Sequence, residues 1–173
     1  MLASPQLVEP IEMTSPPVLA GFAGLYERHY EAVFRTALRV TGRPADAEDV
    51  LQTVFVRLLS GSEHDEAARR PAAYFRRAAV NAAVDVLRRR EIRAASMYDD
   101  QAPHAAVQPQ ALLKARLRRA IATLDSDDAT LFLLRHVEGL SNEELAEMFD
   151  IEKNNVAVRL HRIRQRLQAE LER

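Results

Sequence analysis

The feature that most constrains the fold is a pair of adjoining helical patterns in the last third of the chain, separated by a short break at Asp150 and Ile151. Ser141 precedes Glu144 by three positions, which is the spacing of a capping box at a helix start. After the break, apolar residues return at i, i+4, i+7 and i+11, on one narrow helical face. These residues are Val156, Leu160, Ile163 and Leu167. The pattern predicts two helices joined by a tight turn, the arrangement of a helix-turn-helix.

The outward face of the second of these helices carries polar and basic side chains. A recognition helix places short polar residues near its start against base edges and arginines against flanking phosphates, and Val158 can meet a thymine methyl group. The candidate DNA-reading residues are Asn154, Asn155, Val158, Arg159, His161 and Arg162. An ordinary amphipathic helix with a solvated basic face is the alternative. The capped helix that precedes it favours DNA binding.

The composition favours an all-α fold. The chain has 173 residues, 47% of them apolar, with only five glycines, and no stretch alternates in the manner of a strand. We predict two small helical domains, over residues 21–93 and 111–173, joined by a flexible linker over residues 94–110. Residues 1–20 contain four prolines and are expected to form a flexible leader, because this composition resists regular structure.

Helical periodicity divides the first domain into three segments. The apolar spacing predicts helices over residues 22–40, from about residue 45 to residue 59, and over residues 71–90. A turn through Gly42 and Pro44 ends the first helix, and Pro71 suits the first turn of the third. The intervening residues 61–70 are expected to form a polar loop.

Charge is segregated along the chain, although the formal net charge is only −1. Residues 69–93 hold eight arginines against Asp85 and Glu91, a net charge of +6, whereas acidic residues gather over positions 46–49 without a nearby lysine. The basic segment suits phosphate, and the acidic segment suits a basic protein. An acidic first turn that only stabilises its own helix is the alternative for the second segment.

The sequence offers little that suggests catalysis. It has no cysteine, and its five histidines are scattered, so we expect no disulfide, metal centre or bound cofactor. No glycine-rich phosphate loop or nucleophile–base pair can be argued from spacing, so no catalytic residue and no enzyme activity is predicted. No run approaches the roughly 18 apolar residues of a membrane span, and no secretory signal is evident. We therefore expect a cytoplasmic protein without membrane insertion.

The acidic segment from Ala45 to Phe55, together with Asn81, Asp85 and the terminal helix-turn-helix, resembles a bacterial RNA polymerase sigma factor. The group it resembles is the extracytoplasmic-function (ECF) branch of the sigma-70 family. The resemblance covers about residues 22–90 and 111–170 in the right order. It implies an alternative sigma factor that binds core polymerase, recognises the minus-ten and minus-thirty-five promoter elements and helps to open DNA.

The resemblance implies two interfaces for the first domain. Its acidic helix corresponds to the one that docks on the coiled coil of the polymerase β′ subunit, and the matching residues are Asp46, Glu48, Asp49 and Gln52. The helix from Pro71 corresponds to the segment that contacts and opens the minus-ten element, with arginines for phosphates and aromatics for an unpaired base. The minus-ten candidates are Tyr74, Arg76, Arg77, Asn81, Arg88 and Arg89. Core packing is the alternative for Tyr74 and the expectation for Phe75.

For the second domain, the resemblance implies binding to the minus-thirty-five element in the major groove and to the flap of the polymerase β subunit. The acidic run over residues 125–128 stands where the family usually has proline and a basic or polar residue. This departure either weakens nonspecific DNA contact or provides an edge for a regulator. An anti-sigma factor is an expected further partner, because sequestration is the family's usual control.

Two other functions fit parts of the chain. A helix-turn-helix regulator that binds duplex DNA unaided would explain residues 111–173, but it would leave the acidic and arginine-rich helices without a role. An anti-sigma-like or scaffold protein would use the helices only for protein contacts. That interpretation predicts no salt-sensitive DNA binding, contrary to the arginine distribution.

Overall fold

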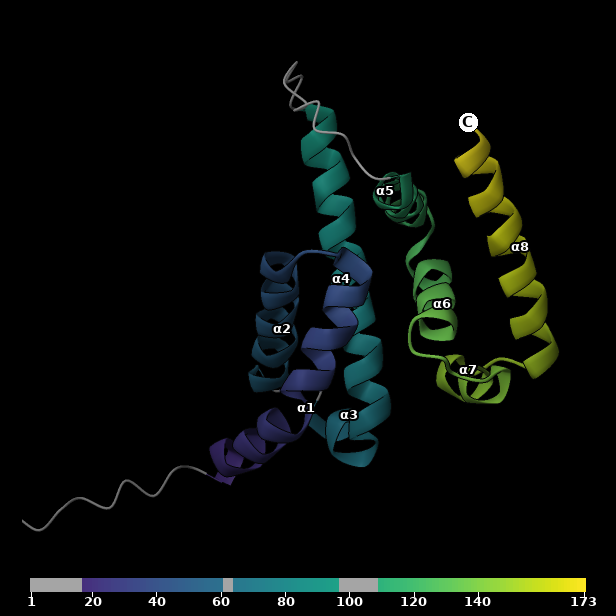
Figure 1. The fold of residues 1–173 in the computed structure, drawn as a ribbon. Helices are drawn as coiled ribbons and strands as arrows, with labels where there is room; N and C mark the ends of the chain where they lie inside the picture. Colours follow the sequence, from purple (N-terminus) through teal and green to yellow (C-terminus); the bar gives the residue numbers. More distant parts are fainter. Residues whose placement is uncertain (1–16, 61–63, 97–108) are drawn as a thin grey trace, which may run out of the picture.

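The computed structural model describes residues 17–60, 64–96 and 109–173, and all regular structure in these ranges is α-helical. The all-α prediction is confirmed. Within these ranges the helices run in the order α1 (Pro17–Thr41), α2 (Pro44–Leu59), α3 (His64–Arg69), α4 (Pro71–Ser96), α5 (Pro109–Ala122), α6 (Ser126–His136), α7 (Asn142–Phe149) and α8 (Lys153–Glu172). Figure 1 shows α1, α2 and α4 bundled together, with α6 between α4 and α8.

The first domain is a bundle of α1, α2 and α4, with the short α3 packed at one end of α4. Leu58 and Phe75 are among its largest fully buried side chains, and burial of such a side chain stabilises a fold by about 1.5–3 kcal/mol. The middle of α4 contributes Ala79, Ala82 and Ala83, all buried. These small side chains allow the neighbouring helices to approach α4 closely.

The turn between α1 and α2 follows from two residues that the sequence places there. Gly42 has φ of +75°, and its amide donates to the Leu38 carbonyl at 2.8 Å, which closes α1. Glycine adopts this left-handed conformation without the steric cost that a Cβ imposes. Pro44 then begins α2, where the missing amide hydrogen costs nothing.

The second domain contains the predicted helix-turn-helix in α7 and α8. The Ser141 hydroxyl accepts from the Glu144 amide at 3.2 Å, and the Glu144 carboxylate accepts from the Ser141 amide at 2.7 Å, so the capping box is present. Asp150 ends α7 with φ of +52°, a conformation that Asp tolerates better than most residues. The four apolar residues of the predicted stripe on α8 are all buried.

Several boundaries differ from the sequence expectations. Residues 64–69 of the expected polar loop form α3, anchored by the buried Ala67. α1 already begins at Pro17, inside the segment expected to be a leader, and α4 continues to Ser96, inside the segment expected to be a linker. The remainder of the leader, residues 1–16, and the central part of the linker, residues 97–108, lie outside the described residues.

Candidate functional site

The acidic residues of α2 divide into a paired and an exposed set. Asp46 lies 3.0 Å from the Arg90 guanidinium, and its side chain is only 16% exposed. Glu48 and Asp49 are exposed, as is Gln52 one turn after Glu48. The structure therefore places three of the four polymerase-binding candidates at the surface and ties Asp46 to α4 within the domain.

The exposed residues of α2 border an open groove of about 870 Å³ between α2 and α4. Asp49 and Gln52 line its α2 side. Val56 and Ile92 also line it and are 63% and 69% exposed, respectively. Exposed apolar side chains surrounded by charged residues are typical of a protein-binding surface.

The minus-ten candidates do not share one surface. Tyr74 is buried, 6% exposed, and its ring centroid lies 5.1 Å from that of Phe75. Phe75 belongs to the core, as predicted, and stacks on His29. Arg89 lies on the other side of α4 and lines the groove next to Asp49. In this conformation the Tyr74 ring is not accessible to a base, and Arg89 lines the same groove as the polymerase candidates Asp49 and Gln52.

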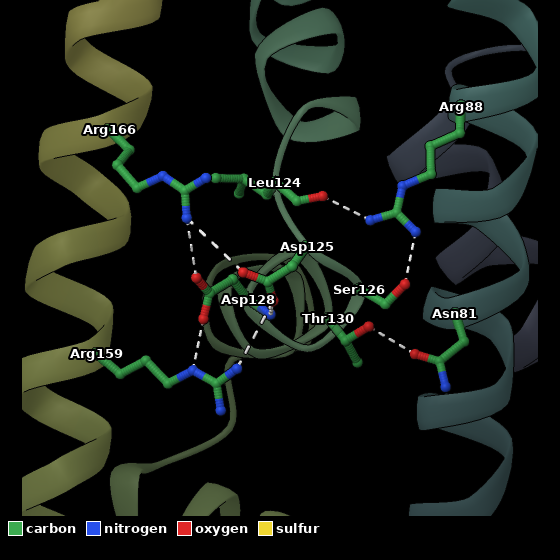
Figure 2. A network of polar contacts seen from close by, with 9 residues as sticks. All are labelled: Asn81, Arg88, Leu124, Asp125, Ser126, Asp128, Thr130, Arg159 and Arg166. Carbon is green, nitrogen blue, oxygen red and sulfur yellow. Dashed lines mark hydrogen bonds and ion pairs between the residues drawn. The ribbon is translucent and has the colours of Figure 1, made fainter. Parts of the chain in front are cut away.

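The four remaining minus-ten candidates face the second domain. Asn81 accepts a hydrogen bond from the hydroxyl of Thr130 on α6 at 2.6 Å. Arg88 donates to the Ser126 hydroxyl and to the Leu124 carbonyl, both at 2.6 Å. Figure 2 shows these contacts between α4 and the start of α6.

Two arginines of the first turns of α4 continue the contact toward α7. Arg77 donates to the Met148 carbonyl at 3.4 Å, and its guanidinium lies 5.4 Å from the centre of the Phe149 ring. Arg76 lies 3.8 Å from the carboxylate of Glu138. The second domain therefore contacts the basic face of α4 along several turns.

The recognition-helix candidates lie on α8, away from its buried stripe. Asn154, Asn155, His161 and Arg162 are exposed, and Val158 is 49% exposed. Because α8 begins at Lys153, the two asparagines lie in its first turn, where a recognition helix usually meets base edges. The outward face predicted from the sequence is therefore present.

Arg159 has a different environment from the other α8 candidates. Its Nε donates to Asp128 at 2.5 Å, and a terminal nitrogen lies 3.8 Å from Asp125. Arg166 lies 3.3 Å from Asp128 and 3.7 Å from Asp125. Figure 2 shows the two arginines of α8 around the two carboxylates at the start of α6. The acidic run thus neutralises part of α8 within the same domain.

Asp125 has a second role as the N-cap of α6, because its side chain accepts from the Asp128 amide at 2.9 Å. Burial tends to raise the pKa of Asp125, but the Asp128 hydrogen bonds and the positive charges of Arg159 and Arg166 hold it below its usual value. Hydrogen bonds and cations both favour the ionised carboxylate.

The sequence analysis singled out Arg159 and the acidic run at 125–128, but it did not predict that they pair with each other. Arg159 and Arg166 are seven residues apart and therefore share a helix face. Their spacing, together with the acidic run at 125–128, was a signal for an ion-pair cluster. Thr130 carried no comparable signal, because a single threonine inside a helix has many possible partners.

Two negative findings concern the described part of the chain. No group of three or more His, Asp or Glu side chains in it is arranged to hold a metal ion. Among the helices of the same ranges, none combines the length and the apolar character needed to cross a membrane.

Two family profiles match separate segments of the chain. The family profile Sigma-70 region 2 matches residues 25–92, and the profile Sigma-70, region 4 matches residues 114–167. The RNA polymerase sigma-E factor of Streptomyces avermitilis is 32% identical over 145 residues, which is 82% of this chain and 80% of the relative. The RNA polymerase sigma-E factor of Streptomyces coelicolor is 31% identical over 144 residues, with coverage of 82% and 80%.

A third relative, the ECF RNA polymerase sigma factor SigE of Mycolicibacterium smegmatis, is 29% identical over 151 residues, which is 83% of this chain but 58% of the longer relative. Together the two profiles cover most of the chain and lie on its two helical units. This chain therefore belongs to the extracytoplasmic-function group of the sigma-70 family of RNA polymerase sigma factors.

Proposed function

We propose that this chain is an alternative sigma factor that docks on core RNA polymerase through the groove between α2 and α4 and selects promoters through α8 and α4. The observation that carries the proposal is the separation of the two kinds of surface on one small chain. The groove presents the Asp49 carboxylate and exposed apolar side chains beside Arg57, Arg89 and Arg93, whereas the outward face of α8 is polar and basic. In this role the chain initiates transcription with RNA polymerase, which supplies the chemistry.

The exposed acidic residues of α2, at one side of the groove, support docking on a basic partner. Glu48 and Asp49 are exposed carboxylates, and Val56 and Ile92 beside them offer apolar surface. Such a surface gains affinity from the apolar contacts, while its charges speed the encounter and fix the register. We assign this groove to the coiled coil of the polymerase β′ subunit, and the second domain to the β flap.

The exposed face of α8 supports binding to the minus-thirty-five element. Asn154 and Asn155 can donate to and accept from base edges in the major groove, and Val158 can pack on a thymine methyl group. Arg162 is exposed on the same face and suits a phosphate. Arg76, Arg77, Asn81 and Arg88 of α4 are assigned to the minus-ten element on the same chemical grounds.

A regulator is part of this proposal. The apolar groove residues Val56 and Ile92 are exposed in the chain alone, and an anti-sigma factor that covered them would compete directly with polymerase. The region 2 and region 4 matches do not identify such a partner, so it rests on the family's usual control and on this exposed surface.

The decisive test is association of the purified chain with bacterial core RNA polymerase, measured by pull-down and gel filtration. Asp49→Arg should weaken association more than tenfold without changing helix content, because it places a cation where the partner is basic. Glu27→Arg makes the same change in charge at an exposed position of α1 outside the groove, and it should bind as the unmodified chain does. Equal binding by both variants would remove the groove from the proposal.

Failure of the unmodified chain to bind polymerase would argue for the second candidate. A helix-turn-helix regulator would bind duplex DNA tightly without polymerase, and it would do so through α8 alone. Such a result would leave Glu48, Asp49 and the groove without a function.

A further inference from the structure

A second cavity, separate from the α2–α4 groove, lies where the last turns of α4 meet α5 and the end of α8. Its volume is about 640 Å³, within the range of roughly 300–1,000 Å³ that small-molecule sites occupy. Figure 1 shows α5 between α4 and α8 at this level. Four arginines line this α4–α5–α8 cavity, and they are Arg88, Arg116, Arg119 and Arg173. A cleft lined by cations attracts anions.

Two glutamates also line the cavity, and each already has an arginine partner. Glu91 pairs with Arg119 at 3.5 Å. Glu170 pairs with Arg173 at 2.8 Å. These two pairs are balanced, so the positive charge of the other two arginines is not offset by a lining carboxylate among the described residues.

Neutral acceptors hold those other two arginines, Arg88 and Arg116. Arg88 donates to the Leu124 carbonyl and to the Ser126 hydroxyl, as Figure 2 shows. Arg116 donates to the Leu171 carbonyl. A guanidinium group carries five N–H donors in a planar fork, so each side chain keeps donors after these bonds. The bonds orient the two cations without neutralising them, and oriented guanidinium groups bind phosphate through paired hydrogen bonds.

The rest of the lining suits an organic anion better than a simple ion. Ile92, Ala120 and Ala122 form an apolar part of the wall, and Ile92 is 69% exposed. The side chains of Arg119 and Arg173 are 70% and 76% exposed. Because exposed ion pairs contribute little stability, both arginines can turn toward a ligand at small cost.

We infer that the α4–α5–α8 cavity binds a free nucleotide of the nucleoside diphosphate class. Its two phosphate groups lie between Arg88 and Arg116, and its base packs on Ile92. This inference goes beyond the proposed function and does not depend on it. Arg88 is shared with the minus-ten assignment, so the test uses Arg116, which has no assigned role in DNA binding.

Backbone phosphates of DNA offer the same chemistry as a nucleotide, but the position of the cavity favours the free ligand. The candidate base-reading residues begin with Asn154 in the first turn of α8, whereas the cavity is lined by Glu170 near its end. At 1.5 Å per residue, these two positions are about 24 Å apart along the helix. Duplex DNA bound at the first turn is therefore remote from the cavity.

Isothermal titration calorimetry of the full chain with adenosine diphosphate, without divalent cations, tests the inference. We expect one site per chain, weaker binding of inorganic pyrophosphate, which lacks the base, and no binding of adenosine, which lacks the phosphates. The bound chain should also have a higher thermal midpoint, because the ligand binds the folded state. Absence of adenosine diphosphate binding would overturn the inference.

Arg116→Gln should weaken adenosine diphosphate binding about tenfold, since it removes a charged donor to phosphate. Arg28→Gln is the matched control. Arg28 is also an exposed arginine that donates to a backbone carbonyl, that of Gly24 at 2.8 Å, and it lies outside the cavity. Equal losses in the two variants would mean that only net charge is sensed, and the inference would fall. A short single-stranded oligonucleotide distinguishes the sources of phosphate: if Arg116→Gln weakens its binding but not that of adenosine diphosphate, the cavity serves nucleic acid.

A change in the opposite direction keeps the test valid if Arg116→Gln loses helix content. Glu91→Gln removes a negative charge from the cavity and frees Arg119, so it should tighten adenosine diphosphate binding several-fold. Glu31→Gln removes the carboxylate of the exposed pair with Arg35 on α1 and should have no effect. Unchanged or weaker binding by Glu91→Gln would contradict the assignment. None of these measurements needs polymerase, so their failure leaves the docking surface of α2 untouched.

Discussion

The Asp128 carboxylate lies 2.5 Å from Nε of Arg159, and this pair joins the start of α6 to α8. The Asp128 side chain is only 14% exposed. It also pairs with Arg166, which lies two helical turns further along α8. A carboxylate shared by two guanidinium groups fixes the rotation of α8 relative to α6. The acidic run that departs from the family pattern therefore supports α8, the helix proposed to read DNA, from within the domain.

Asp128→Ala should destabilise the chain by about 1–2 kcal/mol, because it leaves two arginines without their shared, largely buried partner. The change should appear as a lower urea midpoint. Glu170→Ala removes the exposed pair with Arg173 and is expected to change stability by less than about 0.5 kcal/mol. Equal effects of the two substitutions would mean that the Asp128 cluster contributes no more than a surface pair.

The same cluster predicts that Arg159 and Arg162 contribute unequally to DNA binding. Arg162→Ala should lower the slope of log affinity against log salt by about 0.9, the value expected for one lost phosphate contact. Arg159→Ala should lower the slope less, because Arg159 is paired with Asp128 in the free chain. Duplex minus-thirty-five DNA titrated at several salt concentrations gives both slopes. A larger change for Arg159 than for Arg162 would show that DNA displaces the Asp128 pair.

The lowered pKa of Asp125 predicts that part of the chain's stability is lost in acid. Its pKa is held below the ordinary 3.8 in the folded chain, so the unfolded chain binds more protons in this range. The contribution is complete above the unfolded pKa and is lost as the pH falls through the lowered folded pKa. Asp125→Asn keeps an N-cap acceptor but has no charge to titrate. Thermal midpoints at about pH 6 and about pH 3 should therefore differ more for the unmodified chain than for the variant.

Residues with strong local patterns were predicted well from the sequence. The buried stripe on α8 and the capping box at Ser141 both followed from spacing alone, because each depends on neighbours within one or two helical turns. α3 was missed because its six residues are too few to show a helical period, although Ala67 is buried.

The positions of the candidate site residues depended on contacts that sequence periodicity does not report. Asp46 was grouped with the other acidic residues of α2, but Arg90, 44 positions later, pairs with it. Asn81 and Arg88 were grouped with Arg89 because all three lie on the helix that resembles the minus-ten segment, yet they face α6 while Arg89 faces the opposite groove. Long-range polar partners decide which surface each side chain joins, and a single sequence contains no record of them.

Alanine substitutions at Gly42 and Gly139 allow a matched test of the contact between the domains. Both have positive φ, +75° and +73°, so alanine at either position costs roughly 1 kcal/mol in backbone strain. A Cβ at Gly139 would meet no other atom, whereas a Cβ at Gly42 would collide with the guanidinium group of Arg118. Arg118 would then have to leave the Val40 carbonyl that it contacts from the second domain.

Gly42→Ala should therefore lower thermal stability as Gly139→Ala does, but it should also loosen the docked domain. The chain has no cysteine, so cysteines introduced at the exposed Ala23 of α1 and Ala169 of α8 can carry a donor and an acceptor dye. We expect energy transfer between them to fall for Gly42→Ala and to stay unchanged for Gly139→Ala. Arg118→Ala in the unmodified background should reproduce the fall without any backbone strain. Unchanged energy transfer in both Gly42→Ala and Arg118→Ala would show that the Arg118–Val40 contact does not help to hold the second domain against the first.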